Sequence, residues 1–448
     1  MSKSVCFVLM PFGTKVDSSG RSIDFDRIYD TIFKPAVNAT GLQPVRADEE
    51  QAQGFIHKLM YERLLLSEYA IADLTILNAN VYYELGVRHA ARPSTTIMTM
   101  AGQTGLPFDV AGLRALPYAL NAAGAPADAA GSSAALIAQL KSCIAHEMID
   151  SPIYQLVDGM QPPPIDRARS EVFRERMASF EEIKGQLAGA RDSNKVELIE
   201  TIQNSLGDIS SLEPNVVMDL LLSYRSVGAY DRMLQLVKGM DRTLSQTTMV
   251  RQLQAFAQNR LGQSREAEDN FKQVIAAQGP SSEVNGLLGR VYKDRWENAK
   301  KAGDVFIAKA NLRQAIQTYL EGFEADWRDA YPGINAVTLM EVADDPRRQA
   351  LIPVVRYSVE RRLARKGTAD YWDHATRLEL AVLMDDADTS ADALGDAFSI
   401  APEVWQLETT ARNLRLIADA RTARNGNANE AGVAVEEITK RVNILKSR

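Results

Sequence analysis

Short apolar runs alternate with helical segments over the first third of the chain, and this alternation limits the fold more than any other feature. Apolar runs typical of buried strands occupy residues 5–10, 42–46, 71–77, 95–100 and 116–118. Helical patterns separate the first four runs, and another follows the last. Strands joined through helices lie parallel, with helices on both faces of their sheet. The pattern therefore predicts an α/β domain over residues 1–150, with the flavodoxin-like strand order 2-1-3-4-5.

Two local signals refine this domain. A helix over residues 24–40 is expected to begin at an Asp24 cap and to kink at Pro35, because proline cannot donate the helical hydrogen bond. Residues 119–133 are rich in Ala, Gly and Ser, and they are expected to form a flexible excursion before a helix over 134–148.

The second part of the chain has a different pattern. Prolines interrupt the segment after Ser151, and Pro162-Pro-Pro164 cannot continue a helix, so residues 151–170 are predicted to be a linker. Residues 171–448 are helical almost throughout. Ala255 and Gly289 are separated by the tetratricopeptide repeat length of about 34 residues. We therefore expect an all-α, tetratricopeptide-like domain there, with an irregular helical bundle as the alternative.

Composition excludes several classes of function. A net charge of −7 and a pI near 5.4 provide no basic surface for bulk nucleic-acid binding. No apolar run reaches bilayer length and no signal-peptide pattern follows Met1, so a cytoplasmic protein without membrane contact is expected. The four histidines are scattered, and neither they nor Cys6 and Cys143 have metal-ligand spacing. We expect no metal and no cofactor.

The stretch from Ile71 to Ala90 carries the strongest functional signal. A strand, a turn at Asn78–Asn80 and a helix capped by Asn80 would place Glu84 near the start of a helix, at the carboxyl edge of the sheet. Acidic residues also favour helix N-termini without any further role. The predicted strand order brings this turn beside the loop that follows the first strand, Met10-Pro-Phe-Gly13. That loop lacks the glycine and lysine pattern of a triphosphate-binding loop.

These segments resemble known families. Met10-Pro-Phe-Gly13, Ala72-Asp-Leu74 and Asn80-Val-Tyr-Tyr-Glu-Leu-Gly86 resemble nucleoside 2-deoxyribosyltransferases and related TIR-like nucleotide-cleaving domains. The whole chain resembles bacterial relatives of the N-terminal half of apoptosis signal-regulating kinases, in which a TRAFs-binding helical region follows. Ser151-Pro-Ile-Tyr-Gln-Leu156 and Val172-Phe-Arg174 are similar to the start of that region.

The first resemblance implies a site. Glu84 matches the transferase carboxylate that attacks or stabilises the sugar carbon when the base–ribose bond breaks. The transferases carry an acid where this chain has Asn78, so hydrolysis of a nucleotide or NAD-like substrate is expected rather than transfer. The substrate-binding residues implied are Met10, Pro11, Phe12, Gly13, Arg46, Asp48, Asp73, Asn78, Asn80 and Tyr83.

Two hypotheses of function follow. The first is an N-glycosidase regulated by a helical-repeat sensor in a bacterial conflict or antiviral signalling system. The alternative is a non-catalytic scaffold that binds a nucleotide or assembles proteins through its repeats. The partners expected for the chain are a nucleotide-type small molecule and a partner protein bound through the helical repeats, and both hypotheses are compatible with a homo-oligomer.

Overall fold

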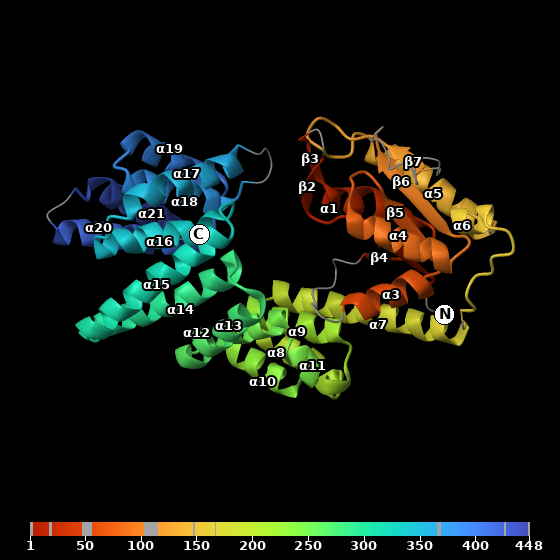
Figure 1. Ribbon diagram of the computed structural model, residues 1–448, viewed down its shortest axis with the longest axis horizontal. Helices are drawn as coiled ribbons and strands as arrows, with labels where there is room; N and C mark the ends of the chain where they lie inside the picture. Colours follow the sequence, from red (N-terminus) through yellow and green to blue (C-terminus); the bar gives the residue numbers. More distant parts are fainter. Residues whose placement is uncertain are drawn as a thin grey trace. The chain divides into compact units, whose positions relative to one another are not determined.

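The computed structural model describes residues 3–17, 20–46, 56–102, 115–146, 148–165, 167–364, 369–424 and 427–446. The chain divides into two compact units, Met1–Thr247 and Thr248–Arg448. Parallel strands occur in the first unit, and the second is entirely helical in its described residues (Figure 1). An α/β region followed by a helical region was expected from the sequence.

The first unit contains a five-stranded parallel sheet in the order β4-β1-β5-β6-β7. The strands are β1 (Val5–Leu9), β4 (Gln43–Arg46), β5 (Tyr69–Asp73), β6 (Thr96–Ala101) and β7 (Ala115–Tyr118). Numbered as parallel strands along the chain, this order is 2-1-3-4-5. The predicted strand order is therefore confirmed, although β5 ends four residues before the predicted strand does.

The strands of the sheet are buried on both faces, and a separate hydrophobic core lies on each face. Along β1, Cys6 and Val8 face one core, whereas Val5, Phe7 and Leu9 face the other. The first core is completed by α1 (Phe25–Ile28), η1 (Tyr29–Phe33), α2 (Lys34–Ala39) and α5 (Ala129–Ala145). The second is completed by α3 (Ile56–Leu66), α4 (Ala79–Ala91) and α7 (Arg167–Asp192).

The predicted kink at Pro35 takes the form of a π-helical segment. Asp24 caps α1 by accepting a hydrogen bond from the Arg27 backbone N–H, as expected. The π-helical turns of η1 run without a break into α2, and Pro35 is the second residue of α2. The wider turns before Pro35 are where a residue that lacks an N–H group is accommodated in a continuous helix.

Two loop predictions need correction. Residues 119–133 do not form a flexible excursion: a bridge pairs Leu120 with Pro126, and Asp128 caps α5, which starts five residues earlier than expected. The polar segment after Gly13 forms a hairpin of β2 (Thr14–Val16) and β3 (Ser22–Asp24). In both places short-range hydrogen bonds order a segment whose small or polar residues suggested a loop.

The segment predicted to be a linker contains the short helix α6 (Pro152–Leu156), and it is attached to α4 at its start. Ser151 Oγ donates to the His89 carbonyl at 2.8 Å, and Tyr154 Oη donates to the Ala90 carbonyl. Further along, Phe173 and Met177 of α7 belong to a core of the sheet, so the helices that follow group with the first unit. These helices are α8 (Val196–Ser205), η3 (Ile209–Ser211), α9 (Pro214–Ser226), α10 (Tyr230–Gly239) and α11 (Arg242–Ser245).

The second unit is an array of helical hairpins (Figure 1). Each helix from α12 to α18 packs against the next, and α20 packs against α21. Helices α14, α16, α18 and α20 also pack in succession, as expected for repeats that stack on one another. The hairpins are α12 (Thr248–Arg260) with α13 (Ser264–Gln278), α14 (Ser282–Lys301) with α15 (Val305–Ala325), α16 (Ala330–Ala343) with α17 (Arg348–Leu363), α18 (Tyr371–Leu383) with α19 (Ala387–Ser399), and α20 (Val404–Ala423) with α21 (Asn429–Lys446). The helical-repeat prediction is confirmed over the irregular bundle.

Small residues allow the central helices of this array to approach closely. Ala255 is fully buried, and a Cβ atom added to Gly289 of α14 would lie 2.8 Å from the ring of Tyr319 on α15. A Cβ added to Gly333 of α16 would similarly lie 2.8 Å from Val355 on α17. The two positions identified from the repeat spacing are therefore packing positions.

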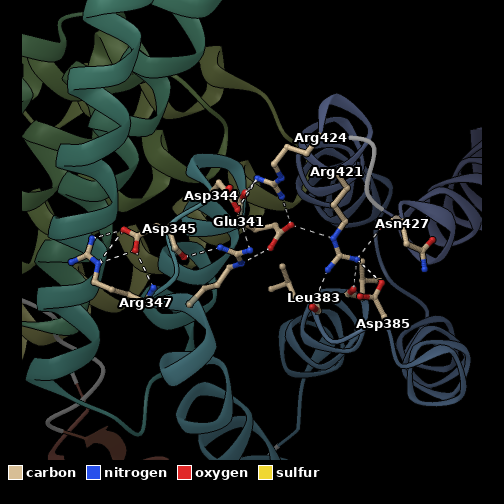
Figure 2. A network of polar contacts seen from close by, with 11 residues as sticks. Glu341, Asp344, Asp345, Arg347, Leu383, Asp385, Arg421, Arg424 and Asn427 are labelled. Atoms are coloured by element: carbon tan, nitrogen blue, oxygen red, sulfur yellow. Dashed lines mark hydrogen bonds and ion pairs between the residues drawn. The ribbon is translucent and has the colours of Figure 1, made fainter.

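Buried ion pairs join the ends of α16, α18 and α20 (Figure 2). Arg421 of α20 pairs with Glu341 of α16 at 3.2 Å and donates to the carbonyls of Val382 and Leu383 at the end of α18. Glu341 also pairs with Arg348 at 2.8 Å and with Arg424 at 2.5 Å. Three arginines around one carboxylate satisfy a charge that is only 5% exposed.

The close approach at Gly289 predicts a stability difference between two glycines. Gly289→Ala should lower the free energy of unfolding by about 1–3 kcal/mol, since its Cβ meets the buried Tyr319 ring. Gly395→Ala in α19 is the matched control, because a Cβ there meets nothing within 4 Å, and helix propensity should raise stability by about 0.5–1 kcal/mol. Urea unfolding followed by circular dichroism measures both. Equal effects of the two substitutions would contradict the packing described.

Candidate functional site

The carboxyl edge of the sheet brings the two predicted segments together. Leu9 of β1 pairs with Ala72 of β5, so Met10–Gly13 and Leu74–Glu84 leave neighbouring parallel strands at the same edge. The helices after these two strands cover opposite faces of the sheet, which makes this the switch point of the strand order. The expected convergence of the two segments is confirmed.

Asn78, rather than Asn80, caps the helix that carries Glu84. The Asn78 side chain accepts hydrogen bonds from the backbone N–H groups of Asn80 and Val81 at 3.0 and 3.3 Å, and α4 begins at Ala79. Asn80 itself is exposed. The predicted N-cap is therefore wrong by two residues. Asparagine is favoured at N-cap positions, and the sequence offers one at each of the two positions.

Glu84 lies in the second turn of α4 and is partly buried. Burial raises the pKa of its carboxyl from an ordinary value of 4.5 to about 7. Within the described ranges, no side chain or backbone group forms a hydrogen bond or an ion pair with this carboxyl. Glu84 therefore changes its protonation state near neutral pH, which suits a general acid or base better than a permanently ionised nucleophile.

Two tyrosines flank Glu84. Tyr83 is 55% exposed, and its hydroxyl contacts that of Tyr61 on α3 at 2.6 Å. Tyr82 is partly buried beside the second core of the sheet, and burial raises the pKa of its hydroxyl, assisted by the charge of Asp73. An exposed tyrosine ring and an unpaired carboxyl thus lie on consecutive positions of one helix.

Asp73 is enclosed within the protein. Its carboxylate accepts hydrogen bonds from Tyr118 Oη at 2.6 Å and from the Thr75 backbone N–H at 2.8 Å, and it is 0% exposed. Thr75 Oγ1 in turn accepts from the Ala101 backbone N–H. Burial raises the pKa of Asp73, and these hydrogen bonds oppose that change. The contacts join the carboxyl ends of β5, β6 and β7.

The Met10–Gly13 loop combines buried and exposed residues. Met10 and Pro11 are buried, whereas Phe12 is 53% exposed with the Lys15 ammonium 5.4 Å from its ring centre. Gly13 adopts φ +65°, a conformation that favours glycine, and its backbone N–H donates to Asp26 at 3.0 Å.

Asp26 also connects this loop to Arg46. The Arg46 guanidinium at the end of β4 pairs with Asp26 at 3.0 Å and lies 4.4 Å from the centre of the Tyr29 ring. Asp26 was not among the residues predicted from the sequence, although its place in the first turn of the expected helix was a signal. Asp48, the other predicted residue in this segment, lies outside the described residues.

Arg88 of α4 is a fully buried charge that was not singled out from the sequence. Its guanidinium donates to the carbonyls of Leu64 at 2.9 Å, Ser67 at 2.7 Å and Glu68 at 3.1 Å, at the end of α3. Burial lowers its pKa to about 9, with a contribution from Arg92. Arg88 therefore fixes α4, and Glu84 with it, against α3 and β5.

His89, at the end of α4, is buried. Burial and the neighbouring Arg88 lower the pKa of its imidazole to about 4, so it is neutral at physiological pH. Across the part of the chain that the structure describes, no three or more His, Cys, Asp and Glu side chains are grouped to hold a metal ion. None of the described helices has the length and apolarity needed to cross a membrane.

Comparison with known proteins gives a family match over most of the chain. A family model described as the MAP3K TRAFs-binding domain matches residues 81–435. The matched region begins within α4, continues through the rest of the sheet, and ends in α21.

Similar curated proteins are mitogen-activated protein kinase kinase kinases. Nsy-1 of Caenorhabditis elegans is 26% identical over 264 residues, which cover 53% of this chain and 17% of that protein. Kinase 15 of Mus musculus is 27% identical over 229 residues, which cover 48% of this chain and 17% of that protein. The similarity thus spans about a sixth of the length of these relatives.

A solved structure that matches part of the chain is TTC0263, a thermophilic tetratricopeptide-repeat protein of Thermus thermophilus. It is 19% identical, with a TM-score of 0.34, and the match covers 45% of this chain and 99% of that protein. The expected likeness to nucleoside 2-deoxyribosyltransferases and TIR-like domains stays a prediction, because neither the family model nor these relatives concern that activity.

The raised pKa of Glu84 predicts a pH-dependent gain of stability on its replacement. Below about pH 4.5 the Glu84 carboxyl is neutral in the folded and in the unfolded chain. Between about pH 4.5 and 7 it is ionised in the unfolded chain but still neutral in the folded one, so a rise in pH across this range favours unfolding. Glu84→Gln should therefore raise the free energy of unfolding by about 1–3 kcal/mol at pH 8 and by little at pH 4.5. Urea unfolding across this range measures the difference.

The control for this measurement is Tyr83→Phe, which changes the neighbouring side chain without altering a carboxyl group. Its stability difference from the natural chain should be constant between pH 4.5 and 8. A Glu84→Gln difference that is equally constant would show that Glu84 is not held in a desolvated position.

Proposed function

Because this chain belongs to the MAP3K TRAFs-binding domain family, we propose that it acts as a scaffold that binds partner proteins through its helical region. The observation that carries this proposal is the family match over residues 81–435, which includes the helical array. TRAF-type signalling proteins, named in the family description, are the first class of partner to test. The sequence also predicted a partner protein that binds through the helical repeats.

The tip of the α14–α15 hairpin is the surface proposed for this contact. Val305, Phe306 and Ile307 are 72%, 89% and 54% exposed, whereas Ala308 in the same turn is 8% exposed. Three consecutive exposed apolar residues are unfavourable in water unless another surface covers them. An exposed aromatic side chain flanked by aliphatic ones is also the usual composition of an interface centre.

The hairpin beneath this tip is suited to a binding role. The helices α14 and α15 are 20 and 21 residues long, and their packing continues close to the tip through Trp296 and Ala299. Asp304 caps α15 by accepting from the Ile307 backbone N–H at 3.0 Å. The apolar residues are therefore held on an ordered helical turn, which lowers the entropy cost of binding.

A second candidate function is cleavage of the base–ribose bond of a nucleotide or NAD-like substrate at the sheet edge. What favours it is the unpaired Glu84 carboxyl with its pKa near 7, at the switch point where α/β folds bind ligands. Glu84 would act as the acid or base, and Phe12 and Tyr83 would offer exposed rings to the base. The scaffold hypothesis does not need this chemistry.

The scaffold hypothesis predicts that binding depends on the apolar tip. Phe306→Asp should weaken the affinity for a TRAF-type partner by about 30-fold or more, since a charge replaces the aromatic side chain that the partner would bury. Val433→Asp is the matched control, because Val433 is 59% exposed on α21, away from the tip in sequence. Isothermal titration calorimetry with purified TRAF domains measures both. Equal affinities for the natural chain and Phe306→Asp would contradict the proposed surface.

The second candidate predicts release of a free base from NAD, a nucleotide or a nucleoside, resolved by chromatography. The release should fall at least about 100-fold in Glu84→Gln, the loss typical of removing a general acid or base. Tyr61→Phe serves as the control, because it removes the hydroxyl contact with Tyr83 but no carboxyl. Base release that persists unchanged in Glu84→Gln would remove Glu84 from the mechanism.

A further inference from the structure

A cavity of about 580 Å³ lies within the helical array, and neither the family match nor the scaffold proposal accounts for it. Its walls come from α12, α13, α14, α16, α17, α18 and α20, all within Thr248–Arg448. This volume is in the range of about 300–1,000 Å³ that small-molecule sites occupy. Both aromatic and charged side chains line it.

One end of the cavity is aromatic. Trp372 and Trp405 have ring centres 5.6 Å apart with an interplanar angle of 46°, and they are 38% and 54% exposed. Tyr331, near the start of α16, also lines the cavity and is 48% exposed. Each of the three residues lies in the first turn of its helix.

The other end of the cavity is polar. Helices α18 and α20 run in the same direction, so residues further along the two helices also face each other. Trp372 meets Trp405 near the two helix starts, and Asn413 Nδ2 donates to Glu379 at 3.0 Å about two turns further on. Lys293 of α14 is 1% exposed and donates to the Asn413 side chain at 3.1 Å and to that of Asn335 at 3.3 Å. The tryptophan rings and the contacts of Lys293 with Asn413 therefore lie about two helical turns apart along the cavity.

The carboxylates that line the cavity already have partners. Asp373 and Asp370 pair with Arg362 at 2.7 and 3.4 Å. Asp329 caps α16 and accepts a hydrogen bond from Ser282 Oγ. Glu379 accepts from the Asn413 amide and is attracted to the Lys293 ammonium. None of these acids is left to attract a cationic ligand strongly.

Arg412, by contrast, lacks such a partner among the described residues. Its guanidinium forms no hydrogen bond or ion pair with the residues the structure describes, and its buried Nε has no acceptor. Burial is the main cause that lowers the pKa of Arg412, and the charges of Arg290 and Arg260 add to it, whereas those of Glu297 and Asp294 oppose it. Arg290 is paired with Asp294 at 2.7 Å, and the Lys293 ammonium is attracted to Glu379. Arg412 has no such pair, so an anion in the cavity would compensate its charge.

The spacing between the aromatic and cationic groups limits the size of this anion. Trp405 and Arg412 both line the cavity from α20, two helical turns apart, which is about 10 Å along the helix axis. A ligand that reaches both needs a flat ring at one end and a negative group about 10 Å away. Nucleoside phosphates have this shape, and their bases stack on aromatic rings.

We propose that the cavity of the helical array is a binding site for a nucleoside phosphate, with its base stacked on Trp372 and Trp405 and its phosphate held by Arg412. Arg290, which is paired with Asp294, and Lys293, which lies beside Glu379, line the same cavity. The site is separate from the sheet edge of the first unit and does not depend on Glu84.

The test is equilibrium dialysis of the full chain with AMP, GMP, CMP and UMP, and with adenosine and inorganic phosphate as partial ligands. At least one nucleotide should bind, and both partial ligands should bind at least about tenfold more weakly than the whole nucleotide. Arg412→Gln should weaken nucleotide binding about tenfold or more, the loss expected for a charge-assisted hydrogen bond.

Arg415→Gln is the matched control, since Arg415 is exposed on the same helix and does not line the cavity. Trp405→Leu tests the aromatic end separately and should also weaken nucleotide binding. Glu84→Gln distinguishes the two units, because a nucleotide held at the sheet edge would lose affinity in that variant alone.

Three results would overturn the proposal. The first is that the natural chain binds none of the nucleotides. The second is that inorganic phosphate binds as tightly as the nucleotide. The third is that the affinity for the nucleotide is unchanged in both Arg412→Gln and Trp405→Leu. None of them bears on the scaffold function, whose test uses a protein partner and the hairpin tip.

Discussion

The helical array depends on helices that touch through residues without side chains. Cβ atoms added at Gly286, Gly289, Gly322 and Gly333 would lie within 2.8–2.9 Å of a neighbouring helix's side chain. Helices α14, α15 and α16 can approach this closely only because those Cβ atoms are absent. The close approach of these helices aligns the hairpins that follow, and this alignment positions the walls of the cavity. It also supports the α14–α15 hairpin, whose tip is apolar. A buried cluster around Glu341 then fixes the far ends of α16, α18 and α20.

Much of the fold could be predicted because strong, local patterns determine it. Fully apolar strands and the helices between them require a parallel sheet, and its order 2-1-3-4-5 was expected. The repeat spacing of Ala255 and Gly289 also identified real packing positions. Some errors are local, such as the cap at Asn78 and the hairpin after Gly13, and others lie where contacts distant in sequence decide the outcome. Nothing in the local pattern of α7 indicates that Phe173 and Met177 complete a core of the sheet, since that depends on how α7 folds back.

The candidate sites differ in how visible they are in a sequence. The sheet-edge residues follow strand ends, so topology alone brings Met10–Gly13 and Glu84 to one edge. Asp73 shows the limit of that argument, because burial and its contacts with Tyr118 and Thr75 depend on partners far along the chain. The cavity residues were not found, since Lys293, Trp372 and Arg412 belong to different hairpins and share no motif. In the sequence, Val305–Ile307 is a short apolar run that could equally be buried, and only its position at the end of a helical hairpin makes it exposed.

The central claim is that this chain binds a protein partner through its helical array. Hydrogen–deuterium exchange of the full chain, with and without a TRAF-type protein, tests it most directly because every segment is observed in one experiment. The account predicts slower exchange on binding at the Val305–Ile307 turn and the adjoining ends of α14 and α15, with Asn78–Glu84 unchanged. Exchange that is unaltered throughout the array, or slowed only at the sheet edge, would contradict it.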